Sequence, residues 1–113
     1  MALRFKLVFF SPRISTAGIL ESLFTDFPHE LGKIGNYEQC AFSTPGVGQF
    51  KPNKDARPAL GSTGQLEHVE EDRVEIIINS DGEREKVKEI ITALKSVHPY
   101  EEVAYDVYRL EIF

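Results

Sequence analysis

The sequence predicts an α+β domain in which a four-stranded antiparallel sheet carries two helices on one face. Three observations lead to this prediction. Residues 3–10 and 67–79 alternate apolar and polar side chains, as strands do. Residues 14–27 and 87–97 repeat apolar side chains at the three- and four-residue steps of a helix. With a weaker strand between them and a last one at the end, the order becomes strand, helix, strand, strand, helix, strand.

The first strand, LRFKLVFF, separates apolar side chains from charged ones. One face carries Leu3, Phe5, Leu7 and Phe9, and the other carries Arg4 and Lys6. Either Ser11-Pro12 or Ser15 starts the following helix, because serine caps a helix and proline fits its first turn. The apolar stripe of this helix consists of Ile14, Ala17, Leu20, Leu23, Phe24 and Phe27, and the segment from Asp26 to Gly35 ends it.

The middle of the chain is less regular. Residues 37–43 (YEQCAFS) form the expected second strand. Residues 44–64 hold four glycines and three prolines with little periodicity, which indicates a long loop or a loop with a short hairpin around GQFKP. A loop of this length in a small domain is usually functional or disordered.

The second half contains the most regular elements. In the strand 67–79, the core-facing side chains are Val74, Ile76 and Ile78, and the opposite ones are Glu71, Arg73, Glu75 and Ile77. Ser80 and Glu83 match a capping box, and the helix after them has the stripe Val87, Ile90, Ile91, Leu94 and Val97. His98-Pro99 ends the helix, and the last strand starts near Val103. This order predicts the ferredoxin-like βαββαβ sandwich.

Length and composition limit the class of protein. A chain of 113 residues with 42% hydrophobic residues predicts one folded domain, 1–113. The net charge of −5 argues against nucleic-acid binding. A single cysteine excludes an intramolecular disulfide, and no apolar run is long enough for a membrane span or a signal peptide. We therefore expect a soluble cytoplasmic protein.

The glycine-rich loop is the best candidate for ligand contact. GVGQFK is not a dinucleotide fingerprint, because Lys51 stands at the third glycine position and no strand–turn–helix context surrounds it. Positive charge nevertheless gathers on this loop of an acidic protein. Exposed backbone N–H groups and cations could hold a phosphate or carboxylate there, at Gly46, Gly48, Lys51, Lys54 and Arg57. The alternative is a solvated loop.

Metal-binding and catalytic signals are weak. His29, His68 and His98 show no HxH or HExxH spacing. His98 and Glu101 are candidate metal ligands, joined by Cys40 or His68, although capping of the helix end explains His98 more simply. Cys40 has the surroundings of a buried, inert thiol.

Carboxylates cluster on the strand 67–79 without forming a catalytic pair. Glu70, Glu71, Asp72 and Glu75 flank Arg73, and a cross-strand ladder with Arg4 and Lys6 accounts for that face. We find no catalytic set of residues, and a non-enzymatic role is preferred.

Three separated motifs carry a family resemblance. They are GKIGNYEQCAFSTPGVGQFKP, RPALGSTGQLEHVEEDRVEIII and HPYEEVAYDVYRLE. From about Gly32 to Leu110 the chain resembles the domain inserted in the YqfO group of GTP cyclohydrolase I type 2 homologues (NGG1p-interacting-factor-like) and stand-alone YqfO-like proteins. HPYE is also similar to the end of CutA proteins. The family motif residues are Gly35, Tyr37, Cys40, Phe50, Pro52, Gly61, Glu71, Arg73, His98, Pro99, Tyr100 and Glu101.

This resemblance implies a CutA/PII-like fold that forms oligomers, either trimers or dimers. In the PII proteins the loop between the second and third strands contacts ligands and partners, which corresponds here to residues 44–64. The two-metal centre of the large family is built by flanking domains, so a hydrolase activity does not follow from the resemblance.

The uncovered face of the sheet suits a subunit interface. It would present Arg4, Lys6, Val8, Phe10, Arg73, Glu75 and Ile77, a mixture of charged and apolar side chains. The leading hypothesis is therefore a non-catalytic regulatory or ligand- and partner-binding module that acts as a homo-oligomer. The alternatives are a divalent-metal-binding protein of the CutA type and a subunit related to a metal-dependent hydrolase family.

Overall fold

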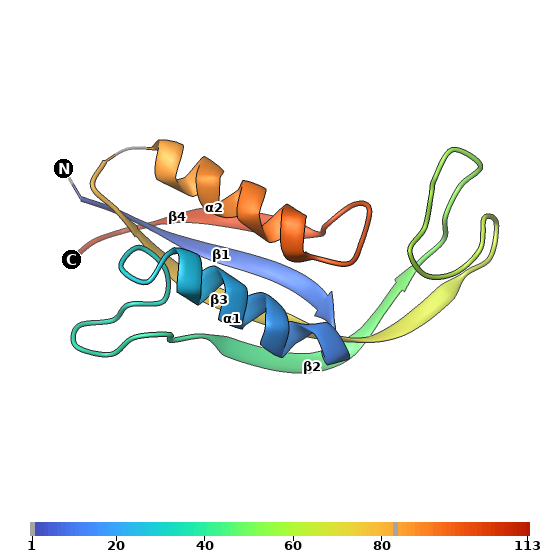
Figure 1. Cartoon of the computed structure of the whole chain (residues 1–113), viewed down its shortest axis with the longest axis horizontal. Coiled ribbons are helices and arrows are strands. Elements are labelled where there is room, and N and C mark those ends of the chain that lie inside the picture. Colours follow the sequence, from blue (N-terminus) through green and yellow to red (C-terminus); the bar gives the residue numbers. More distant parts are fainter. Residues whose placement is uncertain (1, 83) are drawn as a thin grey trace.

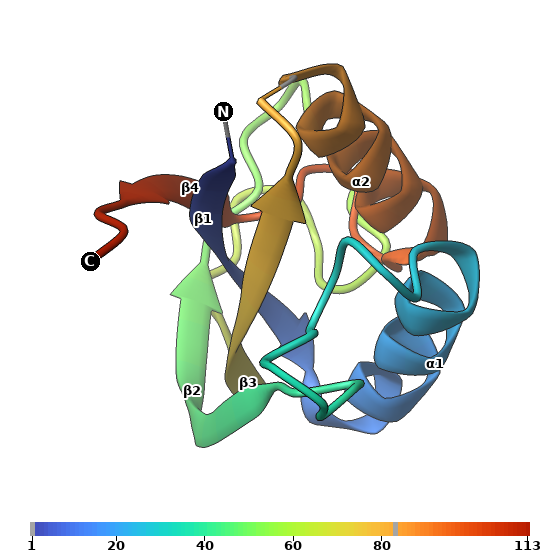
Figure 2. The same cartoon turned by 90° about the vertical axis from the view of Figure 1, so that its left-hand side faces the viewer.

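The computed structural model describes residues 2–82 and 84–113. A four-stranded antiparallel sheet has the strand order β2-β3-β1-β4. Both helices lie on one side of this sheet (Figures 1 and 2), which confirms the predicted ferredoxin-like α+β sandwich. The elements are β1 (Leu3–Pro12), a 3-10 turn (Arg13–Ser15), α1 (Thr16–Asp26), β2 (Phe42–Phe50), β3 (Glu67–Ser80), α2 (Arg84–Val97) and β4 (Tyr105–Leu110).

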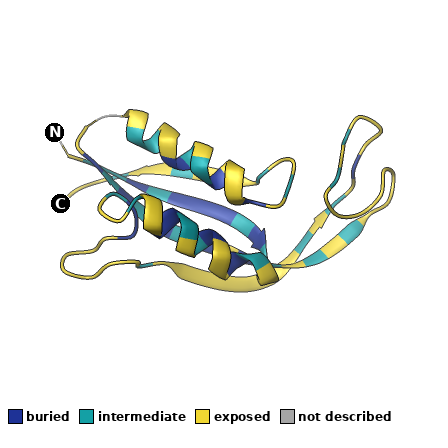
Figure 3. Cartoon of the chain, in the orientation of Figure 1, coloured by how far each residue is buried: buried dark blue, intermediate teal, exposed yellow. Residues whose placement is uncertain are grey.

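The core lies between the two central strands and the helices, where Figure 3 shows the buried residues. Alternation places every second side chain of β1 and β3 beneath the helices, as the sequence predicts. The opposite side chains of these strands, such as Lys6, Glu75 and Ile77, lie on the other face, where the predicted exposure is wrong for Val8, which is 1% exposed. The core cluster is Phe5, Leu7, Phe9, Ile19, Leu23, Phe24, Leu31, Val74, Ile76, Ile78, Ile90 and Leu94.

The first helix starts at the second of its two predicted positions. Ser11 and Pro12 belong to β1, and α1 begins at Thr16, so Ser15 is its N-cap position. The predicted apolar stripe is wrong at Ile14, which is 97% exposed, and at Ala17, which is also exposed. Ile14 lies in the 3-10 turn, whose tighter winding breaks the helical phase of the stripe.

The second strand lies further along the chain than predicted. Of the predicted residues 37–43, only Phe42 and Ser43 belong to it, because the segment from Gly32 to Cys40 folds back on itself. Ile34 and Tyr37 exchange backbone hydrogen bonds of 2.9 Å, and the Cys40 N–H donates to the Gly32 carbonyl at 2.7 Å. The strand β2 instead pairs along β3 from Phe42, opposite Glu75, to Phe50, opposite Glu67. Residues 44–50 of the predicted loop are therefore strand.

The strands β2 and β3 extend past the helices as a two-stranded arm (Figure 1). Pro45 is tolerated in β2 because β2 is an edge strand of the sheet. The arm leads into the segment 51–66, which contains no helix or strand. This arm and segment form one end of the elongated molecule.

The second helix agrees with its predicted stripe except at its end. Ile90 and Leu94 are buried, whereas Val97 is 36% exposed in the last turn. The capping-box prediction involves Glu83, which lies outside the described residues. The helix ends before His98-Pro99, as predicted.

Candidate ligand-binding site

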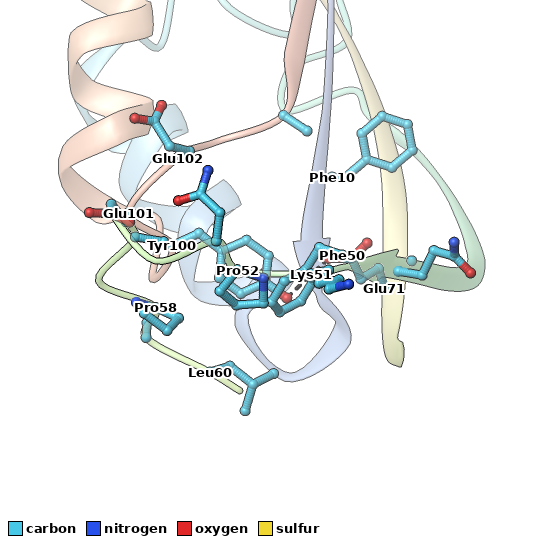
Figure 4. Close-up of a pocket in the computed structure, with 16 residues that line it drawn as sticks. Phe10, Phe50, Lys51, Pro52, Pro58, Leu60, Glu71, Tyr100, Glu101 and Glu102 are labelled. Atoms are coloured by element: carbon cyan, nitrogen blue, oxygen red, sulfur yellow. Dashed lines mark hydrogen bonds between the residues drawn. The ribbon is translucent and has the colours of Figure 1, made fainter. Parts of the chain in front are cut away.

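A cavity of about 450 Å³ opens where the arm, the segment 51–66 and the turn after α2 meet. We name it the Tyr100 cavity. Figure 4 shows its lining side chains, which come from four separate parts of the chain. They are Phe10, Gly48, Gln49, Phe50, Lys51, Pro52, Asn53, Ala56, Pro58, Ala59, Leu60, Glu71, Tyr100, Glu101, Glu102 and Ala104.

Tyr100 and Glu71 form a hydrogen-bonded pair in the wall of the cavity. The Tyr100 hydroxyl donates a hydrogen bond of 3.0 Å to Glu71 Oε2. The Glu71 carboxylate lies against Gly48, at the position that a Cβ atom would occupy in any other residue. The ring of Phe50 lies 5.9 Å from that of Tyr100, at an interplanar angle of 56°. Gly48 therefore allows β2 and β3 to hold Glu71 beneath Tyr100.

His98 anchors the turn that carries Tyr100. Its ring is buried, and Nε2 lies 2.7 Å from the Phe10 carbonyl oxygen. The Tyr100 N–H donates to Nδ1 at 3.1 Å. Because Nδ1 accepts this hydrogen bond, the ring proton lies on Nε2, and the Nε2–H group donates a hydrogen bond to the Phe10 carbonyl. The side chain thus joins the end of α2 to β1, and it does not cap the carbonyls of its own helix.

The segment 51–66 is folded back by backbone contacts. The Gly64 N–H donates to the Pro52 carbonyl at 2.7 Å and closes the base of the segment. The Arg57 N–H donates to Glu101 Oε1 at 2.9 Å. Pro52 is buried. The segment is therefore tied across the cavity to the turn that follows α2.

Two of the five predicted ligand residues line the Tyr100 cavity, namely Gly48 and Lys51. Gly46 borders a smaller neighbouring hollow, and its carbonyl accepts a hydrogen bond of 3.4 Å from Arg13. The side chains of Lys54 and Arg57 are absent from the lining, and Arg57 contributes its backbone N–H to the contact with Glu101. The three cations of the loop thus do not gather at the cavity.

The predicted metal ligands are not assembled around a common point. Both ring nitrogens of His98 are engaged by backbone groups, and Glu101 accepts from Arg57. Within residues 2–82 and 84–113, no three His, Cys, Asp or Glu side chains are grouped as a metal site would require. Cys40 is half-buried in the turn before β2, with Sγ 3.8 Å from the Glu38 carbonyl oxygen.

Most residues of the Tyr100 cavity lie outside the predicted ligand-binding set. Five residues named as family motif residues line it, namely Phe50, Pro52, Glu71, Tyr100 and Glu101, and none of them was predicted to bind the ligand of the loop. The predicted charge ladder is present between Lys6 and Glu75 at 3.3 Å, but Glu71 instead bonds to Tyr100. The family motifs were the available signal, because they single out residues that the fold brings together.

Partial burial, together with the hydrogen bond to the Glu71 carboxylate and its negative charge, raises the pKa of Tyr100 to about 12 from 10.0. The folded state therefore keeps a proton that the unfolded chain loses above pH 10.0. We expect the resulting stability to be present below pH 10.0 and lost as the pH rises towards about 12. Urea unfolding at several pH values measures this slope, and the Tyr100→Phe variant serves as the reference. Equal slopes for the two proteins would contradict the pKa shift.

Comparison with known proteins shows a domain shared with larger ones. No family model matches the chain. It is 42% identical over 106 residues to the GTP cyclohydrolase 1 type 2 homolog of Halalkalibacterium halodurans. The aligned region covers 94% of this chain and 27% of that protein. It is 48% identical over 80 residues to the Bacillus subtilis protein of the same name, covering 71% of this chain and 20% of that protein. The chain thus spans about a quarter or less of these relatives.

Solved structures give the same result. A Bacillus cereus protein related to NIF3 is 38% identical with a TM-score of 0.76, covering 99% of this chain and 27% of that one. CutA from Xylella fastidiosa has a TM-score of 0.63 at 16% identity, covering 97% of this chain and 86% of that one. In the described part of the chain, neither helix has the length and apolar character needed to span a membrane. The chain is therefore homologous to one domain of the GTP cyclohydrolase 1 type 2 homologues, and this domain has a CutA-like fold.

Proposed function

We propose that this domain is a non-catalytic binding module that holds a small ligand in the Tyr100 cavity and works as a homo-oligomer. The observation that carries the proposal is the cavity itself. Its volume of about 450 Å³ falls within the roughly 300–1,000 Å³ of small-molecule sites. Its lining is mostly apolar with a few polar groups, the composition typical of such sites.

The chemistry of the cavity supports binding in preference to catalysis. A general base needs a pKa near the working pH, and the pKa of Tyr100 is raised to about 12. Tyr100 thus keeps its proton near neutral pH, and its hydroxyl donates a hydrogen bond to Glu71. Backbone groups bond to both ring nitrogens of His98. Its imidazole is therefore not available as a general acid or base in the cavity.

The open face of the sheet supports the oligomer. Phe42 is 66% exposed on β2 and Tyr108 is 51% exposed on β4, at opposite edges of that face. Between them lie Lys6, paired with Glu75, and Ile77. Exposed apolar residues interspersed with charges are typical of surfaces that associate.

The two alternative functions lack a supporting observation in the described residues. The predicted metal ligands His98 and Glu101 already bond to backbone groups. A hydrolase function would be inherited from relatives of which this chain spans about a quarter. Neither alternative is proposed here.

A thermal-shift screen of small metabolites against the protein tests the binding function. Binding to the native state raises the unfolding midpoint. We expect the Ala59→Trp variant, which fills the cavity from the segment 51–66, to lose the shift that a ligand produces in the natural protein. The matched control is Ala17→Trp, at an exposed position on α1. A ligand that stabilises Ala59→Trp as strongly as Ala17→Trp would place its site elsewhere and contradict the proposal.

A further inference from the structure

We infer that the Tyr100 cavity takes a small organic cation, an amine or quaternary ammonium group attached to an apolar body. The inference rests on the proposed function and specifies its ligand. The first observation is charge. Three carboxylates line the cavity, from Glu71, Glu101 and Glu102, against a single ammonium group from Lys51. A cleft lined by an excess of one sign of charge concentrates ligands of the opposite sign.

The second observation is the aromatic wall. The rings of Phe50 and Tyr100 are 5.9 Å apart and tilted by 56°. Phe10 also lines the cavity, but its ring already has the Arg73 guanidinium 5.8 Å from its centroid. The faces of aromatic rings attract cations, and sets of rings are used to recognise quaternary ammonium groups. Glu71 bonds to the Tyr100 hydroxyl, so one carboxylate lies beside this aromatic wall. A cation in the cavity beside these groups would lie near both negative charge and aromatic rings.

The third observation is the apolar part of the lining. Pro58 and Leu60 lie on the segment 51–66 and line the cavity together with Phe50 and Pro52 (Figure 4). The backbone bonds that close this segment, including Gly64 to Pro52, fold it across the cavity. An apolar wall of this kind suits the hydrocarbon part of a small molecule.

Lys51 and Glu102 allow the sign of the ligand charge to be tested within the same site. Both are exposed at the cavity rim. Neither side chain has a hydrogen-bond or ion-pair partner within residues 2–82 and 84–113. Their replacement by glutamine therefore changes the charge of the rim without breaking a structural contact.

The experiment compares three probes of similar size and different charge. They are benzyltrimethylammonium, its neutral isostere neopentylbenzene, and benzoate. Each is titrated into the ¹⁵N-labelled protein, and the amide signals of Arg57 and Tyr100 report on the cavity because both amides are bonded in its wall. We expect benzyltrimethylammonium to bind about three- to thirtyfold more tightly than the neutral isostere, the range of a cation–π contact. Benzoate is expected to bind most weakly.

Four variants assign the effect to the cavity. Glu102→Gln is expected to weaken the binding of benzyltrimethylammonium about threefold, and Lys51→Gln to tighten it about threefold, since exposed charges have small effects. Phe50→Leu keeps an apolar side chain without a ring. It is expected to weaken the binding of benzyltrimethylammonium about tenfold and to change the binding of the neutral isostere less. Lys54→Gln is the matched control, because Lys54 lies on the same segment but does not line the cavity.

Several outcomes would overturn the inference. If benzoate binds most tightly and Lys51→Gln weakens it, the cavity is an anion site, and the proposed binding function remains. Equal affinities for the cation and its neutral isostere would contradict the preference for a cation, and they also leave the proposed binding function intact. The absence of any response from these probes and from the metabolite screen would contradict both proposals.

Discussion

Replacement of His98 by leucine is expected to lower the free energy of unfolding by about 3 kcal/mol, because two partly buried backbone groups each lose a partner at roughly 1–3 kcal/mol. The groups are the Phe10 carbonyl, which accepts from Nε2, and the Tyr100 N–H, which donates to Nδ1. Leucine fills most of the space of the ring but offers neither a donor nor an acceptor. Urea unfolding with linear extrapolation measures the loss.

Two further variants separate the bonds of His98. His98→Asn places an amide oxygen near the position of Nδ1 and keeps the bond from Tyr100, whereas His98→Gln places an amide N–H near Nε2 and keeps the bond to Phe10. Each is expected to be more stable than the leucine variant and less stable than the natural protein. The control is His68→Leu, at an exposed position on β3. Equal stability of His98→Leu and His68→Leu would refute the anchoring role of His98.

Charge introduced on the open face is expected to separate the proposed oligomer into single chains. The double variant Phe42→Glu, Tyr108→Glu replaces the two large exposed side chains at opposite edges of that face. An interface that buries these positions would have to bury unpaired carboxylates, which is strongly unfavourable. Light scattering should show a multiple of 12.8 kDa for the natural protein and a single chain for the variant.

The matched control for the oligomer is Ile14→Glu. Ile14 is 97% exposed in the 3-10 turn before α1, away from the open face of the sheet, and its replacement should leave the mass unchanged. A mass of one chain for the natural protein at micromolar concentration would contradict the oligomer. A variant mass equal to that of the natural protein would place the interface on another surface.

Side-chain periodicity was enough to predict most of the fold. The alternation in 67–79 and the stripe of 87–97 match β3 and α2, because a buried face imposes its period on the residues that form it. The same rule failed for β2. Its residues are mostly exposed, with glycine and proline among them, so no buried face marks the strand. Hydrogen bonding to β3 decides where β2 lies, and the sequence of β2 alone does not reveal that pairing.

The candidate site depended even more on the tertiary structure. The sequence by itself determined the ferredoxin-like class, the end of α2 at His98 and the motif residues that later proved to be neighbours. The tertiary structure decided that Gly48, Glu71 and Tyr100 meet in one wall, and that Lys51 enters the cavity whereas Lys54 does not. The physical reason is that local periodicity reports which face of an element is buried. A cavity forms between elements, from groups distant in sequence that strand register and backbone hydrogen bonds bring together.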